Sequence, residues 1–343
     1  MEKFNVVIMY PRWEGKYSEA LSFDPRINLI DGIKYFKMAS QSREGDASAS
    51  GLANPFTDAD VIVMGAPVLK SIVKQAPRLK WVHSASAGVS NAWRSDLWTS
   101  NILLTSGRGT MGAVPIAEYV IAGILAVAKG FSKAYFQKAL HKALLREDYH
   151  PISIYGKTIG IIGLGGIGKE VAHRASAMGM RVIATRRHVE TAQENVGGVH
   201  LILPAKNLPE LLAASDFVVV CVQWTPETHH LLGEKEFQLM RKGVILVNPS
   251  RGEVIDENAM VTALNDGILR GALLDTYERE QDEPKRPPRQ ELLDLPNVLL
   301  TPHNSAEVDG YDIKPGLQLF RENLRRFLMN ETLINVVDRE LGY

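Results

Sequence analysis

The sequence of 343 residues has a single cysteine, which excludes an internal disulfide. That residue, Cys221, lies within the apolar run DFVVVCV, which favours a buried, inert thiol over a nucleophile and fits a reducing compartment. The sequence also has no excess of positive or negative charge. Lys and Arg together number 39, and Asp and Glu together also number 39. No overall field therefore attracts nucleic acid or an anionic membrane, although a local basic cluster could still bind an anion.

The sequence also lacks an apolar run of the roughly 20 residues that a membrane span requires. The most apolar segment, AVPIAEYVIAGILAVA at residues 113 to 128, carries Glu118 and is better interpreted as a buried helix. The first residues, MEKFNVVIMYPRWEG, contain an apolar stretch that is too short for a secretory signal and typical of a first strand. We therefore expect a cytoplasmic protein with no membrane partner.

The sequence is rich in apolar strand-like runs that alternate with helical patterns. Between Lys157 and His303 the strand-like runs are TIGIIG, RVIATR, DFVVVCV, VILVNPS, GALLDTY and NVLLTPH. Strands of nearly continuous Val, Ile and Leu, separated by helices, predict a parallel sheet that is covered on both faces. A shorter series, NVVIMY, DVIVMGA, LKWVHSAS and ILLTSG, precedes residue 110 and predicts a second, smaller α/β domain.

A chain of this length exceeds the size at which one core usually keeps growing, so two domains are expected. The fold class that we predict is α/β, with a doubly wound, Rossmann-type cofactor domain at residues 112–305. The second domain would be a smaller, flavodoxin-like substrate domain. It would be discontinuous, formed by residues 1–111 and 306–343, because the helical pattern KPGLQLFRENLRRFLMN can carry the chain back to it.

The glycines Gly163, Gly165 and Gly168 form the spacing G-x-G-x-x-G between a strand and a helix. In a dinucleotide-binding turn the first glycine permits the tight bend, the second lets the backbone approach a pyrophosphate, and the third lets helix and strand pack closely. Gly166 and Ile167 would join the site, since the helix N-terminus offers free N–H groups and a positive dipole. The alternative is a glycine-rich turn needed only for packing.

The next strand ends in arginines, in the sequence RVIATRRH. Arg186 follows Gly168 by 18 residues, where an NAD-binding unit commonly has a carboxylate for the adenosine ribose. A carboxylate would repel a 2′-phosphate, whereas a guanidinium can pair with it through two charge-assisted hydrogen bonds. We therefore predict that Arg186, with Arg187 and Thr185, binds the 2′-phosphate, and that the protein prefers NADP(H), with NAD(H) as the weaker ligand. The alternative is a solvated cluster of arginines.

Charged or titratable residues lie at the ends of three other strand-like runs. Arg251 follows VILVNPS, Asp275 lies in GALLDTY with Glu280 just beyond it, and His303 follows NVLLTP. Ligands of open α/β sheets bind outside the carboxyl ends of the strands, so these side chains can converge. Arginine suits a carboxylate, and histidine suits proton transfer near neutral pH. Each residue alone could equally be a surface or turn residue.

In this order along the chain, the following segments resemble those of one family: LKWVHSASAGVSN, PIAEYVIAGILA, GKTIGIIGLGGIGKEVA, TPETHHLLGEKEFQLMRKGVILVNPSRGEVIDENAMVTAL, LLDTYERE, NVLLTPH and FRENLRRFLMNETLINVVD. The chain resembles the D-isomer-specific 2-hydroxyacid dehydrogenases, and more closely their glyoxylate/hydroxypyruvate reductase branch. The resemblance implies hydride transfer from a nicotinamide to the carbonyl carbon of a small 2-keto acid, giving a D-2-hydroxy acid. It also implies a homodimer formed through residues 114–145.

The resemblance assigns roles to individual residues. Arg251 would bind the carboxylate and the carbonyl oxygen, and His303 paired with Glu280 would be the acid and base. Asp275 would contact the nicotinamide. The loop that would hold the substrate carboxylate comprises Ala87, Gly88 and Val89. Further cofactor contacts would come from the ends of the later strands, at Val222, Pro226, Pro249 and Ser250.

The chain departs from the family at some positions. The family often has Glu-Pro where this chain has Glu280 and Gln281, which leaves Glu278 as a substitute partner for His303. No metal is expected, because His229 and His230 are adjacent rather than spaced to share a helix face. Three alternatives stay open: a regulatory nucleotide sensor of the C-terminal binding protein type, a cofactor-binding scaffold without turnover, and a reductase of a bulkier 2-keto acid.

Overall fold

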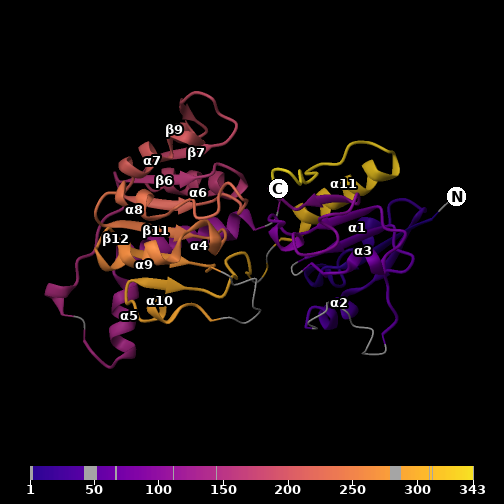
Figure 1. Cartoon of the computed structure of the whole chain (residues 1–343), viewed down its shortest axis with the longest axis horizontal. Coiled ribbons are helices and arrows are strands. Elements are labelled where there is room, and N and C mark those ends of the chain that lie inside the picture. The colour runs from indigo at the N-terminus through magenta and orange to yellow at the C-terminus, as the bar shows by residue number, and fades with distance from the viewer. Residues whose placement is uncertain are drawn as a thin grey trace. The chain divides into compact units, whose positions relative to one another are not determined.

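The computed structural model of the chain describes residues 3–41, 52–65, 68–110, 112–143, 145–278, 287–308, 310 and 312–342. The chain divides into two compact units (Figure 1). The first consists of Met1–Met111 with Gly310–Tyr343, and the second is Gly112–Asp309. Each unit is built around its own parallel sheet.

The first unit contains a five-stranded sheet in the order β2-β1-β3-β4-β5, with every neighbouring pair parallel. This is the flavodoxin-like order. The strands are β1 (Phe4–Met9), β2 (Ile27–Asp31), β3 (Val61–Met64), β4 (Trp81–Ser84) and β5 (Leu103–Ser106). The helices are α1 (Ser18–Leu21), α2 (Ile33–Ala39), α3 (Ile72–Gln75) and α11 (Lys314–Leu328), with short 3-10 turns at Pro11–Trp13 and Ser90–Ala92.

Two apolar cores lie against this sheet, one on each face, because successive strand residues point to opposite sides. Val7 and Met9 of β1 pack with α2 and α3. Val6 and Ile8 of the same strand pack with α1 and with Phe320 of α11. Helix α11 therefore belongs to the first unit although it follows the whole second unit in the sequence.

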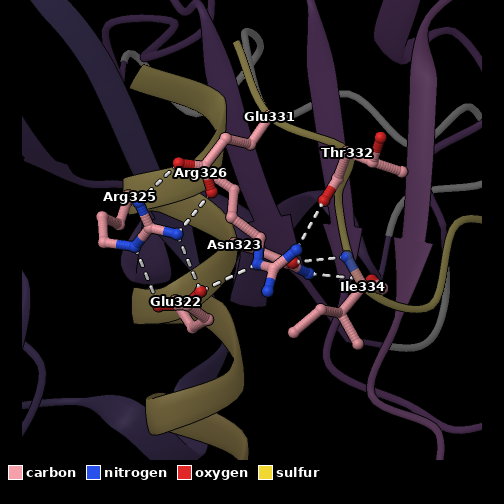
Figure 2. A network of polar contacts seen from close by, with 7 residues as sticks. All are labelled: Glu322, Asn323, Arg325, Arg326, Glu331, Thr332 and Ile334. Carbon is pink, nitrogen blue, oxygen red and sulfur yellow. Dashed lines mark hydrogen bonds and ion pairs between the residues drawn. The ribbon is translucent and has the colours of Figure 1, made fainter. Parts of the chain in front are cut away.

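Polar contacts fix the segment that follows α11 (Figure 2). The completely buried Asn323 donates from Nδ2 to the carbonyl oxygen of Ile334 (2.9 Å) and accepts from the Ile334 N–H (2.7 Å). On the exposed side of the helix, Arg325 contacts Glu322 and Glu331 together. The chain then reaches β5, where the N–H of Val337 donates to Leu104.

The second unit contains an eight-stranded sheet in the order β13-β12-β11-β10-β6-β7-β9-β8 (Figure 1). The strands are β6 (Thr158–Ile162), β7 (Arg181–Arg186), β8 (Gln193–Val196), β9 (Val199–Pro204), β10 (Phe217–Val220), β11 (Val244–Asn248), β12 (Leu269–Leu274) and β13 (Val298–Leu300). Only β8, at the edge, is antiparallel to its neighbour. Without it, the order is that of a doubly wound dinucleotide-binding sheet whose direction of winding reverses between β6 and β10.

Helices cover both faces of this sheet. The helices are α4 (Ala113–Ala128), α5 (Phe131–Ala139), α6 (Gly166–Ala177), α7 (Leu208–Ala214), α8 (Glu234–Gln238), α9 (Glu257–Asn265) and α10 (Gln290–Leu293), with 3-10 turns at Arg146–Asp148, Ala205–Asn207 and Gly252–Val254. Phe217 and Val219 of β10 pack with α4 and α6, whereas Val218 and Val220 pack with α7, α8 and α9. The predicted fold class, a Rossmann-type domain with a smaller flavodoxin-like domain, is confirmed.

The apolar stretch at residues 114–145 forms two helices rather than one. Lys129 and Gly130 separate α4 from α5, and Gly130 has a left-handed backbone (φ 71°) that ends the first helix. Among the described residues, no single helix is long and apolar enough to cross a membrane. Only α4 and α5 taken together, bent by 71° at the break, meet that criterion, by length and composition alone.

Candidate active site

Backbone geometry explains two of the three glycines in the turn that follows β6. Gly163 has φ 98°, and a Cβ there would lie 2.8 Å from Cγ1 of Val222, which follows β10. A Cβ on Gly168 would lie 2.2 Å from the carbonyl oxygen of Gly163, so only glycine lets α6 approach β6 this closely. A Cβ on Gly165 would instead meet nothing within 4 Å. The packing of the chain itself therefore does not require glycine at position 165. A phosphate group that approaches the helix N-terminus would require it, because a side chain there would occupy the same space.

Strand β7 ends beside this turn. The N–H of Leu164 donates to the carbonyl oxygen of Thr185 (3.1 Å), and Thr185 is buried. The next residue, Arg186, is exposed, and within the described part of the chain its side chain has no hydrogen bond or ion pair. The guanidinium of Arg186 is therefore available to an anion near the turn.

Arg187 differs from Arg186, because its guanidinium pairs with Glu227 in the loop after β10. This loop is shaped by Thr228, whose hydroxyl donates to the carbonyl oxygen of Gln223 (2.6 Å) and accepts from the N–H of Thr225 (2.8 Å). Pro226 is exposed at its tip. Surface ion pairs contribute little to stability, so a ligand anion could replace Glu227 as the partner of Arg187.

Arg251 follows β11 at the same edge of the sheet. Pro249 is buried, and Ser250 is fixed by Asn248, whose Oδ1 accepts from the Ser250 hydroxyl (2.8 Å) and N–H (3.0 Å). The Asn248 amide also donates to the carbonyl oxygen of Arg251 (2.8 Å). The backbone that carries the partly exposed Arg251 is therefore held by the end of the strand before it.

Asp275, at the end of β12, holds the loop that carries His303. Its completely buried carboxylate accepts from the hydroxyl of Thr301 (2.7 Å) and from the N–H groups of Asn304 and Ser305 (3.0 Å each). Because Thr301 donates its only proton to Asp275, the hydroxyl of Tyr119, 2.6 Å away, must donate to Thr301. Burial raises the pKa of Tyr119 above its ordinary value, so this donor stays protonated.

His303 is partly exposed and has φ 55°, a left-handed conformation that costs free energy for a residue other than glycine. The hydrogen bonds to Asp275 at Thr301, Asn304 and Ser305 flank His303 on both sides and sustain this conformation. Its expected partner, Glu280, lies outside the described residues. The alternative partner Glu278 pairs with His230 instead, at 3.0 Å from Nε2.

The loop at residues 87–89 lies in the first unit, directly after β4. Val89 is buried, while Ala87 and Gly88 are partly exposed. A Cβ on Gly107 would lie 2.6 Å from the carbonyl oxygen of Ala85, so the ends of β4 and β5 approach closely at this glycine. The proposed binding loop thus starts from a tightly packed pair of strand ends.

Two further expectations concern thiol and metal chemistry. Cys221 is partly exposed at the end of β10 rather than buried, yet the desolvation of its sulfur raises the thiol pKa to about 12, which disfavours a nucleophile. Within the described ranges, no group of three or more His, Cys, Asp or Glu side chains could hold a metal ion.

The second unit is similar in sequence to a known protein family. Residues 121–305 match the family model for the NAD-binding domain of D-isomer specific 2-hydroxyacid dehydrogenases. The glyoxylate reductase of Pyrococcus horikoshii is 35% identical over 83% of this chain and 84% of its own length. The chain belongs to the D-isomer-specific 2-hydroxyacid dehydrogenase family.

Other members of the family are also similar. The D-3-phosphoglycerate dehydrogenase of Methanocaldococcus jannaschii is 33% identical over 84% of this chain, which spans only 53% of that protein. Among solved structures, the NADPH-dependent glyoxylate/hydroxypyruvate reductase of Sinorhizobium meliloti, in complex with NADP and sulfate, has a TM-score of 0.73. It is 25% identical, and the match covers 99% of this chain and all of that one.

Members of the D-2-hydroxyacid dehydrogenase family are NAD(P)-dependent oxidoreductases, so the expected family and enzyme class are confirmed. The roles of individual residues in the turn, at the strand ends and in the loop at 87–89 stay predictions. Sequence patterns did not indicate the Tyr119–Thr301–Asp275 chain of hydrogen bonds or the His230–Glu278 pair.

Proposed function

We propose that the protein is an NADPH-preferring reductase of small 2-keto acids, such as glyoxylate or hydroxypyruvate, and that it forms D-2-hydroxy acids. Family membership and the similarity to glyoxylate reductases support reduction of a keto acid. The observation that carries the cofactor preference is the exposed Arg186, unpaired within the described part of the chain, at the end of β7.

The residues of the second unit fit a dinucleotide. The open space at Gly165 and the N-terminus of α6 at Gly166 and Ile167 would receive the pyrophosphate. Arg186, with Arg187 released from Glu227, would bind the 2′-phosphate that distinguishes NADPH from NADH. The remaining proposed contacts at this edge of the sheet are Thr185, Val222, Pro226, Pro249, Ser250 and Asp275.

A bound reduced nicotinamide would supply the hydride that reduces the carbonyl carbon of the keto acid. Arg251 would bind the carboxylate and the carbonyl oxygen through its planar guanidinium, which polarises the carbonyl group. His303 in its protonated form would donate a proton to that oxygen as negative charge develops there. We further propose that Glu280 is the partner of His303. The backbone at residues 87–89 would be a further segment that binds the carboxylate.

The cofactor preference can be tested by binding. Fluorescence titration should give a lower dissociation constant for NADPH than for NADH in the wild type. Arg186→Asp should weaken NADPH binding by at least about tenfold, because each lost charge-assisted hydrogen bond contributes about 1.5 to 3 kcal/mol. It should leave NADH binding nearly unchanged. Arg181→Asp, at the opposite, exposed end of β7, is the matched control and should change neither constant. Equal affinities of the wild type for both cofactors would contradict the proposal.

We also propose that the enzyme is a homodimer formed through α4 and α5. Several apolar side chains in this region are exposed, including Val114, Phe131 and Tyr135, of which Tyr135 is 72% exposed. Exposed apolar groups of this extent favour association with another protein surface. Light scattering at micromolar concentration should give twice the mass of the chain, and a monomeric mass would reject this assembly.

A further inference from the structure

His230 occupies an unusual position in the loop after β10. Its φ is 49°, which is costly for a residue other than glycine, so surrounding contacts must sustain it. The N–H of His230 donates to the carbonyl oxygen of Glu253 (2.9 Å), and its Nε2 lies 3.0 Å from Oε1 of Glu278. The ring stacks on His229 with centroids 4.1 Å apart. His230 therefore connects the segment after β11 with the segment after β12.

Glu278 is held at two points. Its side chain contacts His230, and its N–H donates to Oε1 of Glu257 (2.6 Å). Glu257 is buried at the start of α9, with 4% of its surface exposed. Arg289 pairs with Glu291 and also interacts electrostatically with Glu257 and Glu278. The backbone at residues 277–278 is thus fixed by the hydrogen bond between Glu278 and His230 on one side and by a buried carboxylate on the other.

The fixed backbone packs directly on the residue after Arg251. A Cβ on Gly252 would lie 2.0 Å from the carbonyl carbon of Tyr277 and 2.3 Å from the nitrogen of Glu278. The two segments therefore touch backbone to backbone, with no side chain between them to absorb a displacement. A shift at residues 277–278 would be transmitted to Gly252 and so to Arg251.

We propose that His230 is a positioning residue for Arg251, acting through its pair with Glu278 and the backbone contact at Gly252. The inference rests on the proposed function, in which Arg251 binds the keto acid. Small displacements of a substrate-binding group cost large factors in rate, so loss of the pair should lower turnover although His230 itself touches no substrate. A surface ion pair without this role would leave turnover unchanged.

The test compares His230→Leu, His230→Gln and the neighbouring exposed control His229→Leu in the intact enzyme. His230→Leu should lower kcat/KM for the keto acid by about tenfold or more, while the dissociation constant of NADPH stays within about twofold of the wild-type value. His230→Gln should recover most of the loss, because an amide can still donate to Glu278. His229→Leu removes the ring that stacks on His230 but leaves the bond to Glu278 in place, so it should lower kcat/KM much less than His230→Leu. Combining His230→Leu with Glu278→Gln should be no worse than the more damaging single change, as expected for residues that act as a pair.

Two results with His230→Leu would overturn the inference: unaltered turnover, or a parallel loss of NADPH binding that reveals general unfolding. Failure of His230→Gln to recover activity would also contradict it. These results differ from a failure of the proposed function, in which the wild-type enzyme itself would reduce no 2-keto acid.

Discussion

Replacing Asp275 with asparagine tests how the fold holds the loop that carries His303. The carboxylate accepts two hydrogen bonds at Oδ1, from Thr301 and Asn304, and one at Oδ2, from Ser305. Asparagine has nearly the same shape, and its oxygen can retain the two Oδ1 bonds. Its NH₂ group would then face the N–H of Ser305, so two donors would meet in a site with no exposed surface.

The expected cost follows from these contacts. A hydrogen bond to a charged group contributes about 1.5 to 3 kcal/mol, and a buried donor left without an acceptor costs about 1 to 3 kcal/mol. Because asparagine retains two of the three bonds, we expect Asp275→Asn to lower the free energy of unfolding by about 2 to 4 kcal/mol. Since the loop also sustains the left-handed backbone of His303, kcat should fall by about 10- to 100-fold.

Urea unfolding and steady-state kinetics with NADPH and a 2-keto acid measure the two effects. Thr301→Val is the control. It removes the hydroxyl that donates to Asp275 and accepts from Tyr119, but it leaves the buried charge and both main-chain bonds in place, so its effect on kcat should be smaller. If Asp275→Asn matched the wild type in stability and in kcat, Asp275 would not be what holds the loop. If NADPH affinity fell as far as kcat, contact with the nicotinamide would be the dominant role of Asp275.

Four other changes test further parts of the account. Arg251→Lys should keep the fold but lower kcat/KM for the keto acid, because lysine lacks the planar fork; equal efficiency would mean that a point charge suffices. His303→Ala should reduce kcat by about 100-fold or more with little effect on NADPH affinity, and unaltered turnover would remove it from the mechanism. Burial lowers the pKa of His83 to about 3, so below pH 6.5 the unfolded chain binds a proton that the native state does not, and stability is lost as the pH falls. Between pH 7 and pH 5 the wild type should lose about 2 kcal/mol in urea unfolding that His83→Gln retains. Asn323→Ala should cost about 2 to 4 kcal/mol, because it removes a completely buried side chain that bonds both the N–H and the C=O of Ile334; a loss no larger than that of Arg325→Ala, whose side chain is 42% exposed, would contradict this.

Most interior strands of both sheets were predicted, because burial on two faces demands a continuous apolar run; β9, with the sequence VHLILP, is the interior strand that was missed. Strand β10, with the sequence FVVV, is buried at every residue and is clear in the sequence. The edge strands β2 and β8 were missed for the opposite reason. All four residues of β8, QENV, are exposed, and β2, INLID, has no fully buried residue. Neither pattern distinguishes a strand from a loop, and only pairing with β9 or β1 defines them.

In the candidate site, too, features that depend on neighbouring residues in the sequence were predictable, and contacts between distant residues were not. The glycines at 163 and 168 are needed for backbone geometry at the turn itself, so the spacing indicates the turn without knowledge of the rest of the fold. The pair of His230 with Glu278 joins residues 48 positions apart, and the bond of Thr301 with Asp275 joins residues 26 apart. Such contacts depend on which strands become neighbours in the sheet, and no periodicity in the sequence encodes that.

The central claim is that this member of the D-2-hydroxyacid dehydrogenases reduces a small 2-keto acid with NADPH. The most direct test is to follow the oxidation of NADPH and of NADH by the wild-type enzyme with glyoxylate, hydroxypyruvate, pyruvate and a bulkier 2-keto acid. We predict that glyoxylate or hydroxypyruvate gives the highest kcat/KM, and that NADPH exceeds NADH by at least about tenfold, as expected for one or more charge-assisted hydrogen bonds to the 2′-phosphate. Oxidation of neither cofactor with any of these acids, or equal efficiency with both cofactors, would contradict the account.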